Sequence, residues 1–284
     1  MKLRLFPFAL LLNLLFALPV AAQSLDDVFI KGDMLDYQGY EATRHFNPRT
    51  RYSTATIKKG RRVLAILRNG WFLEDSTRIG LFSFLGGDNK QLIVEQYTGG
   101  AHCCWIYKIY NLSTDFRLLF DGTRYGIDEV GYELNLVDID HDGRYEFTQS
   151  EMAFDYFHMS HAVSRFPTVV FAYDERAREY RPANARFAEY VLRGIEQDIE
   201  EVKKLNGQTL PADESFVREK IFSAVIQVLL KYIYSGRETE GWSFYDRNYK
   251  LSDREQMRAE IKKQLKSSII YNSIYRRGNH RGSR

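Results

Sequence analysis

Cysteine is almost absent from this sequence of 284 residues, which contains only the adjacent pair Cys103 and Cys104. A lipoprotein needs a cysteine directly after its signal cleavage site, and neither cysteine lies there, so that kind of lipid attachment is excluded. Long apolar runs are lacking after residue 18. Because a membrane-spanning helix needs about 20 apolar residues, the sequence predicts no transmembrane segment in the mature chain.

The sequence also has no large excess of positive or negative charge, and it contains no familiar catalytic motif. The formal net charge is only +3, which does not indicate nucleic-acid binding. The sequence contains no Gly-x-Ser-x-Gly elbow, no Gly-x-x-x-x-Gly-Lys-Ser/Thr phosphate loop and no His-Glu-x-x-His helix. These absences do not exclude catalysis by an arrangement that has no short motif.

The first 22 residues have the features of a cleavable signal peptide. Lys2 and Arg4 precede an apolar run over residues 5–18, and small residues lead to a cleavage site before Gln23. At about 14 residues this run is short for a membrane span, so an uncleaved anchor is the less favoured alternative. The sequence therefore predicts a protein that is periplasmic or secreted.

Two regions of different periodicity follow the signal peptide, and they predict an α+β fold. Residues 23–185 contain short β-branched and aromatic runs between Gly, Asn and Asp, which indicates a β-rich antiparallel domain. Residues 186–275 carry apolar residues at helical spacing, which indicates an α-helical domain. Residues 276–284 are expected to form a disordered basic tail.

Individual elements can be placed from these patterns. Strands are expected at 52–57, 62–67, 79–85, 91–97, 105–110, 117–120, 133–137, 145–149 and 168–173. Apolar stripes predict one helix over residues 187–202 and a second over 217–232. A third helix is expected to start at Ser252, which forms a capping box with Glu255. The aromatic segment 242–249 is expected to link the last two helices.

One loop between two expected strands has the spacing of a calcium site. Its candidate ligands are Asp138, Asp140, Asp142, the backbone carbonyl of Arg144, and Glu146. Acids at alternate positions can turn their oxygens toward one ion, and calcium takes 6–8 oxygen ligands. Gly143 supplies the left-handed backbone that such a turn needs. The alternative interpretation is an acidic surface turn without a metal.

This loop resembles the calcium loop of FG-GAP/VCBS repeats, the units of integrin-like β-propellers. The Asp-x-Asp-x-Asp-Gly-x-x-Glu pattern carries the resemblance, and the loop lies between strands rather than helices. Residues 85–94 resemble a second copy at an offset of 55, with the acidic ligands lost. The resemblance covers about residues 80–180 and implies propeller-blade-like hairpins. Two copies do not close a propeller, which takes about 4–8 blades.

The cysteine pair and the histidines define a second candidate site. Cys103 and Cys104 can form a structural disulfide in an oxidising compartment, remain buried thiols, or bind a soft metal together with His102. His158 and His161 could add nitrogen ligands to such a site, since their spacing places both rings on one face of a helical turn.

Three hypotheses about function follow. The preferred one is an exported, non-catalytic binding module for an envelope protein or a polysaccharide, held rigid by calcium. The main alternative is a thiol- or metal-dependent periplasmic enzyme centred on His102, Cys103 and Cys104. The third is a structural component of the envelope, attached through the basic residues that follow Lys262.

Overall fold

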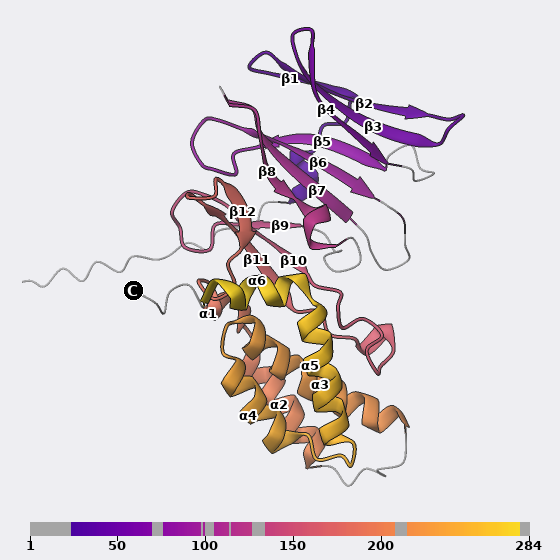
Figure 1. Ribbon diagram of the computed structural model, residues 1–284, viewed down its shortest axis with the longest axis vertical. Helices are drawn as coiled ribbons and strands as arrows, with labels where there is room; N and C mark the ends of the chain where they lie inside the picture. The colour runs from indigo at the N-terminus through magenta and orange to yellow at the C-terminus, as the bar shows by residue number, and fades with distance from the viewer. Residues whose placement is uncertain are drawn as a thin grey trace, which may run out of the picture.

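The protein consists of three antiparallel sheets followed by a bundle of helices (Figure 1). The structure is a computed structural model, and it describes residues 24–69, 76–97, 99, 105–113, 115–126, 134–207 and 215–278. The predicted α+β class is confirmed, with strands before residue 185 and α-helices after it. The expected signal peptide, the cysteine pair, His102 and residues 279–284 lie outside the described residues.

Each sheet is a four-stranded meander in which neighbouring strands follow one another along the chain. The first sheet contains β1 (Met34–Tyr37), β2 (Tyr40–Asn47), β3 (Tyr52–Lys59) and β4 (Arg62–Asn69). The second contains β5 (Thr77–Phe82), β6 (Gln91–Tyr97), β7 (Trp105–Asn111) and β8 (Arg117–Asp121). The third contains β9 (Asn135–Val137), β10 (Glu146–Ser150), β11 (Thr168–Asp174) and β12 (Glu179–Pro182). None of the three sheets closes on itself into a barrel.

The second sheet lies in the middle of the stack and is buried on both faces. Along β6, Leu92 and Val94 pack into a core shared with the first sheet, whereas Ile93 packs into a core shared with the third sheet and the helices. Burial on both faces explains why Leu92, Ile93 and Val94 are three consecutive apolar residues and do not alternate with polar ones.

The helical region contains more helices than the sequence predicts. Its members are α1 (Ala188–Val191), α2 (Ile195–Asn206), α3 (Ser215–Tyr234), α4 (Glu238–Asn248), α5 (Arg254–Ser267) and α6 (Ile269–Gly278). The single helix expected over 187–202 is wrong, because Gly194 adopts a left-handed conformation (φ 74°) and separates α1 from α2. The link expected at 242–249 is also wrong, since α4 covers most of it and buries Trp242 and Tyr245.

Two further expectations for the helical region differ from the structure. The capping box at Ser252 does not form: α5 begins at Arg254, and its N-cap residue Asp253 makes no side-chain capping hydrogen bond. Helix α6 extends to residue 278, which lies inside the segment expected to be a tail.

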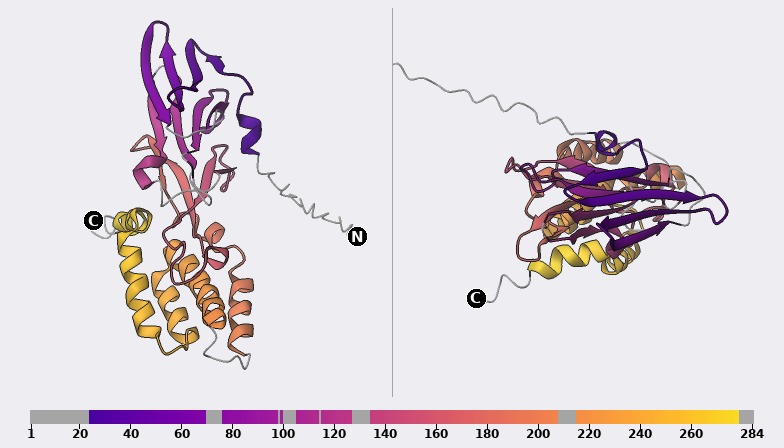
Figure 2. Two further views of the ribbon diagram at one scale, coloured as in Figure 1. Left: turned by 90° about the vertical axis from the view of Figure 1, so that its right-hand side faces the viewer. Right: turned by 90° about the horizontal axis from the view of Figure 1, so that it is seen from above.

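The bundle packs against the third sheet and leaves the first sheet at the far end of the molecule (Figure 2). Helix α3 is the central helix, because it contacts α2, α4 and β11. Among the described residues, no helix combines the length and apolarity that crossing a bilayer requires.

Candidate functional site

The loop between β9 and β10 brings three of the predicted ligands together. One carboxylate oxygen from each of Asp138, Asp140 and Glu146 lies within 4.8 Å of the others. The hairpin explains this convergence, because Val137 pairs with Glu146 across the two strands and so places both ends of the loop side by side. Among the described residues this is the one group of three or more acidic, histidine or cysteine side chains so arranged.

Backbone N–H groups hold Asp138 inside the turn. Its two carboxylate oxygens accept hydrogen bonds from the N–H groups of Asp142 and Gly143, each at 3.1 Å. Gly143 (φ 82°) and His141 (φ 58°) are both left-handed, which curls the chain around this carboxylate. Asp142 is not a member of the converging group, and its Oδ1 accepts the N–H of Arg144 at 2.8 Å.

Glu146 is the buried member of the group and is only 3% exposed. Its Oε2 accepts the N–H of Ile139 at 2.9 Å. Burial and the nearby charge of Asp140 raise the pKa of Glu146 from 4.5 to about 7, against the opposing effects of the Ile139 N–H and of Arg186. A carboxylate in this position calls for a compensating positive charge when it ionises.

Two arginines, one beside the loop and one within it, form ion pairs here. Arg186, which follows β12, forms an ion pair with Asp140. Arg144 forms an ion pair with Glu175 instead of turning toward the acids. Asp140 therefore links the loop to the start of the helical region through Arg186.

The loop also packs directly on the corresponding loop of the second sheet. The N–H of Tyr145 donates to the carbonyl of Phe84 at 2.9 Å. The hydroxyl of Tyr180 lies 3.1 Å from both carbonyls, of Phe84 and of Tyr145. Gly86 approaches so closely that a Cβ there would lie 2.4 Å from the carbonyl oxygen of Gly143. The candidate ion site thus lies at the junction of two sheets.

The residues present fit a hard cation. The donors are carboxylate oxygens, which calcium and magnesium prefer over softer metals. The three carboxylate oxygens lie close enough together to contact one such ion, once Asp140 is released from Arg186.

His158 and His161 contact different carboxylates in the structure. The Nδ1 of His161 lies 2.8 Å from Asp155 Oδ1, the neighbour expected from the sequence. His158 contacts Glu260 of α5 instead. Since His102, Cys103 and Cys104 lie outside the described residues, the thiol or soft-metal site stays a prediction.

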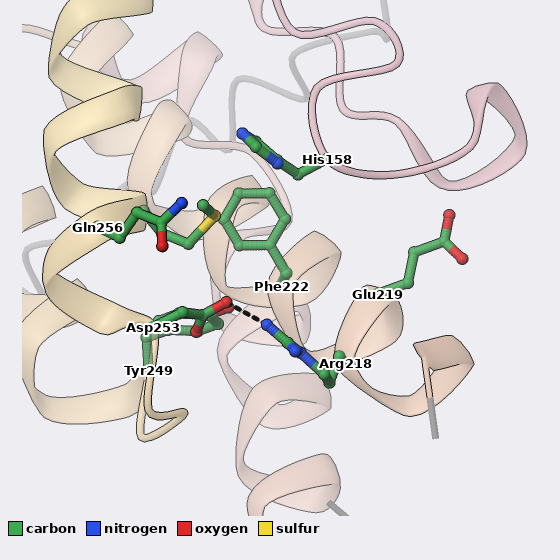
Figure 3. Close-up of a pocket in the computed structure, with 8 residues that line it drawn as sticks. His158, Arg218, Glu219, Phe222, Tyr249, Asp253 and Gln256 are labelled. Atoms are coloured by element: carbon green, nitrogen blue, oxygen red, sulfur yellow. Dashed lines mark hydrogen bonds and ion pairs between the residues drawn. The ribbon is translucent and has the colours of Figure 1, made fainter. Parts of the chain in front are cut away.

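A cavity of about 360 Å³ in the helical region was not predicted (Figure 3). Its lining residues come from α3, α5, the segment between α4 and α5, and the connection between β10 and β11, and Arg218 and Asp253 of this lining form an ion pair. The apolar stripe of α3 gave no signal for it, because Arg218 and Glu219 fall on the polar side of that stripe.

Comparisons of this chain with protein-family models, with curated proteins and with solved structures find no match. Its function is therefore inferred from its own residues.

Proposed function

We propose that this protein is an exported, non-catalytic binding module in which the loop over residues 138–146 holds a calcium ion. The observation that carries the proposal is the convergence of Asp138, Asp140 and Glu146 in a hairpin loop. Acids at the first, third and ninth positions are the ones that meet, which agrees with the order of ligands in a calcium loop.

Calcium bound here would act as a structural element. It would neutralise three carboxylates that otherwise repel one another, one of which is buried. It would also stiffen a loop that contacts Phe84 in the second sheet and, through Asp140, Arg186 at the start of the helices. Outside the cytoplasm calcium is abundant enough to fill sites with dissociation constants of about 10⁻⁴–10⁻³ M, so the site would be occupied constantly.

The three meanders supply the surface for binding in this proposal. We regard them as propeller-blade-like units in an open stack, with an envelope protein or a polysaccharide as the partner. The β-sheet end of the molecule projects away from the helices, which supports a role in reaching such a partner (Figure 2).

Thermal unfolding of the purified protein tests the ion site. Calcium is expected to raise the melting temperature and EDTA to reverse the increase, because the ion binds only the folded loop. Asp140→Asn is expected to abolish this response. Asp88→Asn, a change to an exposed acid in the corresponding loop of the second sheet, is the matched control and should preserve it.

The outcomes are distinct. If calcium leaves the melting temperature of the unaltered protein unchanged up to about 10 mM, beyond the weakest calcium modules, the ion proposal fails. If magnesium at the same concentration stabilises the protein equally, the site is a general divalent-cation site and not a calcium site.

A further inference from the structure

The first sheet is strongly basic, although the chain as a whole is nearly neutral. Residues 34–69 contain eight Lys or Arg residues and two Asp or Glu residues, a charge of +6, whereas the whole chain carries +3. Most of these cations lie in or beside the two turns at the ends of β3, at Arg49, Arg51, Lys58, Lys59, Arg61 and Arg62. The sheet forms the end of the molecule away from the helices (Figure 2). The positive charge is therefore displayed at one end of the protein.

The acids of this sheet leave much of that charge available. Lys58 pairs with Glu41 at 3.6 Å, and Asp36, the other acid, is the partner of Glu41 across β1 and β2. Arg61 and Arg62 are exposed in the hairpin that joins β3 to β4, and neither forms an ion pair within the described part of the chain. Two guanidinium groups at the tip of this hairpin can thus contact an anion.

The outer face of the same sheet exposes apolar side chains. Among the described residues six large apolar side chains are exposed, and four of them, each 48–58% exposed, belong to this sheet: Met34, Tyr52, Val63 and Ile66. The strand register aligns Met34, Thr43, Thr56 and Ile66 in one row across the four strands. Their neighbours Leu35, Ala42, Ala55 and Leu67 fill the core shared with the second sheet, so this row lies on the opposite face.

Cations and apolar side chains are neighbours on this face. Val63 is the cross-strand partner of Lys58, and so lies directly beside the basic hairpin. Single exposed apolar residues are common on protein surfaces, but a group of them bordered by charge marks an interaction surface. Such a surface suits a partner that offers both negative charge and an apolar interior.

The dimensions of the face narrow the choice of partner. Neighbouring strands lie about 4.8 Å apart, so Met34 on β1 and Ile66 on β4 are about 14 Å apart. Because β3 has eight residues, the two basic turns lie about 25 Å apart. A partner that contacts all of these groups is extended as well as anionic and partly apolar. A lipid bilayer with anionic headgroups has these properties, whereas an acidic polysaccharide has no apolar interior.

We propose that the outer face of the first sheet docks on an anionic lipid surface. The basic turns at the two ends of β3 would contact headgroup phosphates, and Met34, Val63 and Ile66 would lie at the boundary with the acyl chains. Each Lys or Arg near such a surface strengthens binding about fivefold. The face is separate from the loop over residues 138–146, so this proposal does not rest on calcium binding.

Co-sedimentation with lipid vesicles tests the proposal, with the mature protein from Gln23 onward and with EDTA present. Vesicles of phosphatidylglycerol and phosphatidylcholine in equal parts should bind about tenfold or more tightly than vesicles of phosphatidylcholine alone. High salt should reduce this difference, because it screens exposed charges. Basic residues beside an exposed edge strand such as β4 can also serve only to prevent pairing with other chains. That alternative predicts equal or no binding to the two kinds of vesicle, and such a result would overturn the proposal.

Removing the charge of the hairpin tests where the vesicle binds. Arg61→Gln/Arg62→Gln should weaken binding to the anionic vesicles roughly 25-fold. Its matched control is Lys263→Gln/Lys266→Gln, which removes two exposed lysines from α5 and should bind like the unaltered protein. An equal loss in both variants would mean that the vesicles respond to overall charge, and would contradict docking by the first sheet.

Removing the apolar side chains tests whether the partner is a lipid. Val63→Ser/Ile66→Ser keeps every charge and should still weaken binding about tenfold, because less apolar surface enters the bilayer. Dextran sulfate, a polyanion without an apolar part, is the comparison. If this variant binds anionic vesicles normally and dextran sulfate displaces the protein from them, the face recognises charge alone and the lipid proposal fails.

Two single variants separate docking from folding and from the ion loop. Glu41→Gln removes the acid that holds Lys58 and should strengthen binding to the anionic vesicles about fivefold. A gain of this kind, with an unchanged melting temperature, does not come from a folding defect; unchanged or weaker binding would contradict the proposal. Asp140→Asn should bind the vesicles normally, so a failure of the calcium proposal and a failure of lipid docking give different results.

Discussion

Gln91 and Glu146 occupy the same position in two hairpins of the same register. Gln91 begins β6 and pairs with Phe82, and Glu146 begins β10 and pairs with Val137. Each side chain accepts a hydrogen bond from a loop N–H, at 3.1 Å for Gln91 and 2.9 Å for Glu146. The two hairpins therefore share a scaffold and differ in charge: a neutral amide closes one loop, and a carboxylate closes the other.

Glu146→Gln should give the ion loop the chemistry of its neutral counterpart. Because the pKa of Glu146 in the folded protein is about 7 rather than 4.5, the folded state binds more protons than the unfolded state between these values. In EDTA, the free energy of unfolding should therefore fall by about 1–3 kcal/mol as the pH rises from about 4.5 to beyond 7. Glu146→Gln should lack this loss and should also lack stabilisation by calcium.

Chemical denaturation at pH 5 and pH 8, with EDTA or calcium, measures both effects. The unaltered protein should be more stable at pH 5 than at pH 8 in EDTA, and calcium should restore stability at pH 8. A Glu146→Gln variant that is still stabilised by calcium would show that Glu146 is not a ligand.

Gln91→Glu is the converse change. It places a buried carboxylate in a loop that has serine, leucine and glycine where the ion loop has aspartates, at Ser83, Leu85 and Gly87. The variant should lose about 1–3 kcal/mol of stability at pH 8 and regain it toward pH 5, as burial of an unpaired carboxylate requires. Calcium should not restore it, and a calcium response at this position would mean that the carboxylate alone, without converging aspartates, recruits the ion.

The sequence predicted the local features of this fold more reliably than the contacts between distant segments. The strand expected at 91–97 matches β6, and the hairpin expected at 52–67 matches β3 and β4, since these runs combine β-branched residues with clear turns. Strands β1 and β2 were missed because their polar residues face solvent and dilute the pattern. Helix α4 was missed because its aromatic residues do not form a single stripe.

The same distinction applies to the candidate sites. Spacing alone predicted that Asp138 and Asp140 would converge, because the ligands lie in one short loop. The pairing of Asp140 with Arg186, 46 residues away, depends on how β12 leads into the helices and has no local signal. The cavity around Asp253 has no local signal either, because its lining residues come from α3, α5, the segment between α4 and α5, and the connection between β10 and β11, which only packing brings together.

Arg186→Gln should increase the affinity of the loop for calcium. The guanidinium neutralises Asp140 in the ion-free loop and must give up this pairing when a cation binds. Since partly exposed ion pairs contribute about 0.2–1 kcal/mol, the affinity should rise by a factor of roughly 1.4 to 5. Calcium titration followed by tyrosine fluorescence or calorimetry provides the measurement. Arg193→Gln, an exposed change beyond the loop's contacts, is the control, and a lower affinity in Arg186→Gln would indicate that Arg186 supports the bound state instead.

Gly86→Ala should separate the two loops and thereby test whether the ion site depends on the second sheet. An alanine Cβ at this position would lie 2.4 Å from the carbonyl oxygen of Gly143, inside any real contact distance, so one of the loops must shift. Gly87→Ala is a matched control, because Gly87 is also left-handed (φ 68°) but has open space around its missing Cβ. In both variants the free energy of unfolding should fall by about 1 kcal/mol, because alanine is strained in a left-handed backbone. The Gly87→Ala control measures this shared cost alone.

The stability of Gly86→Ala should fall by roughly a further 1–3 kcal/mol because of the clash with the Gly143 carbonyl. It should also bind calcium more weakly than Gly87→Ala, because the carbonyl of Gly143 belongs to the turn that holds Asp138. Denaturation curves and calcium titrations of the two variants measure these differences. Equal calcium affinities in the two variants would mean that the loop over residues 138–146 forms its ion site without support from the neighbouring sheet.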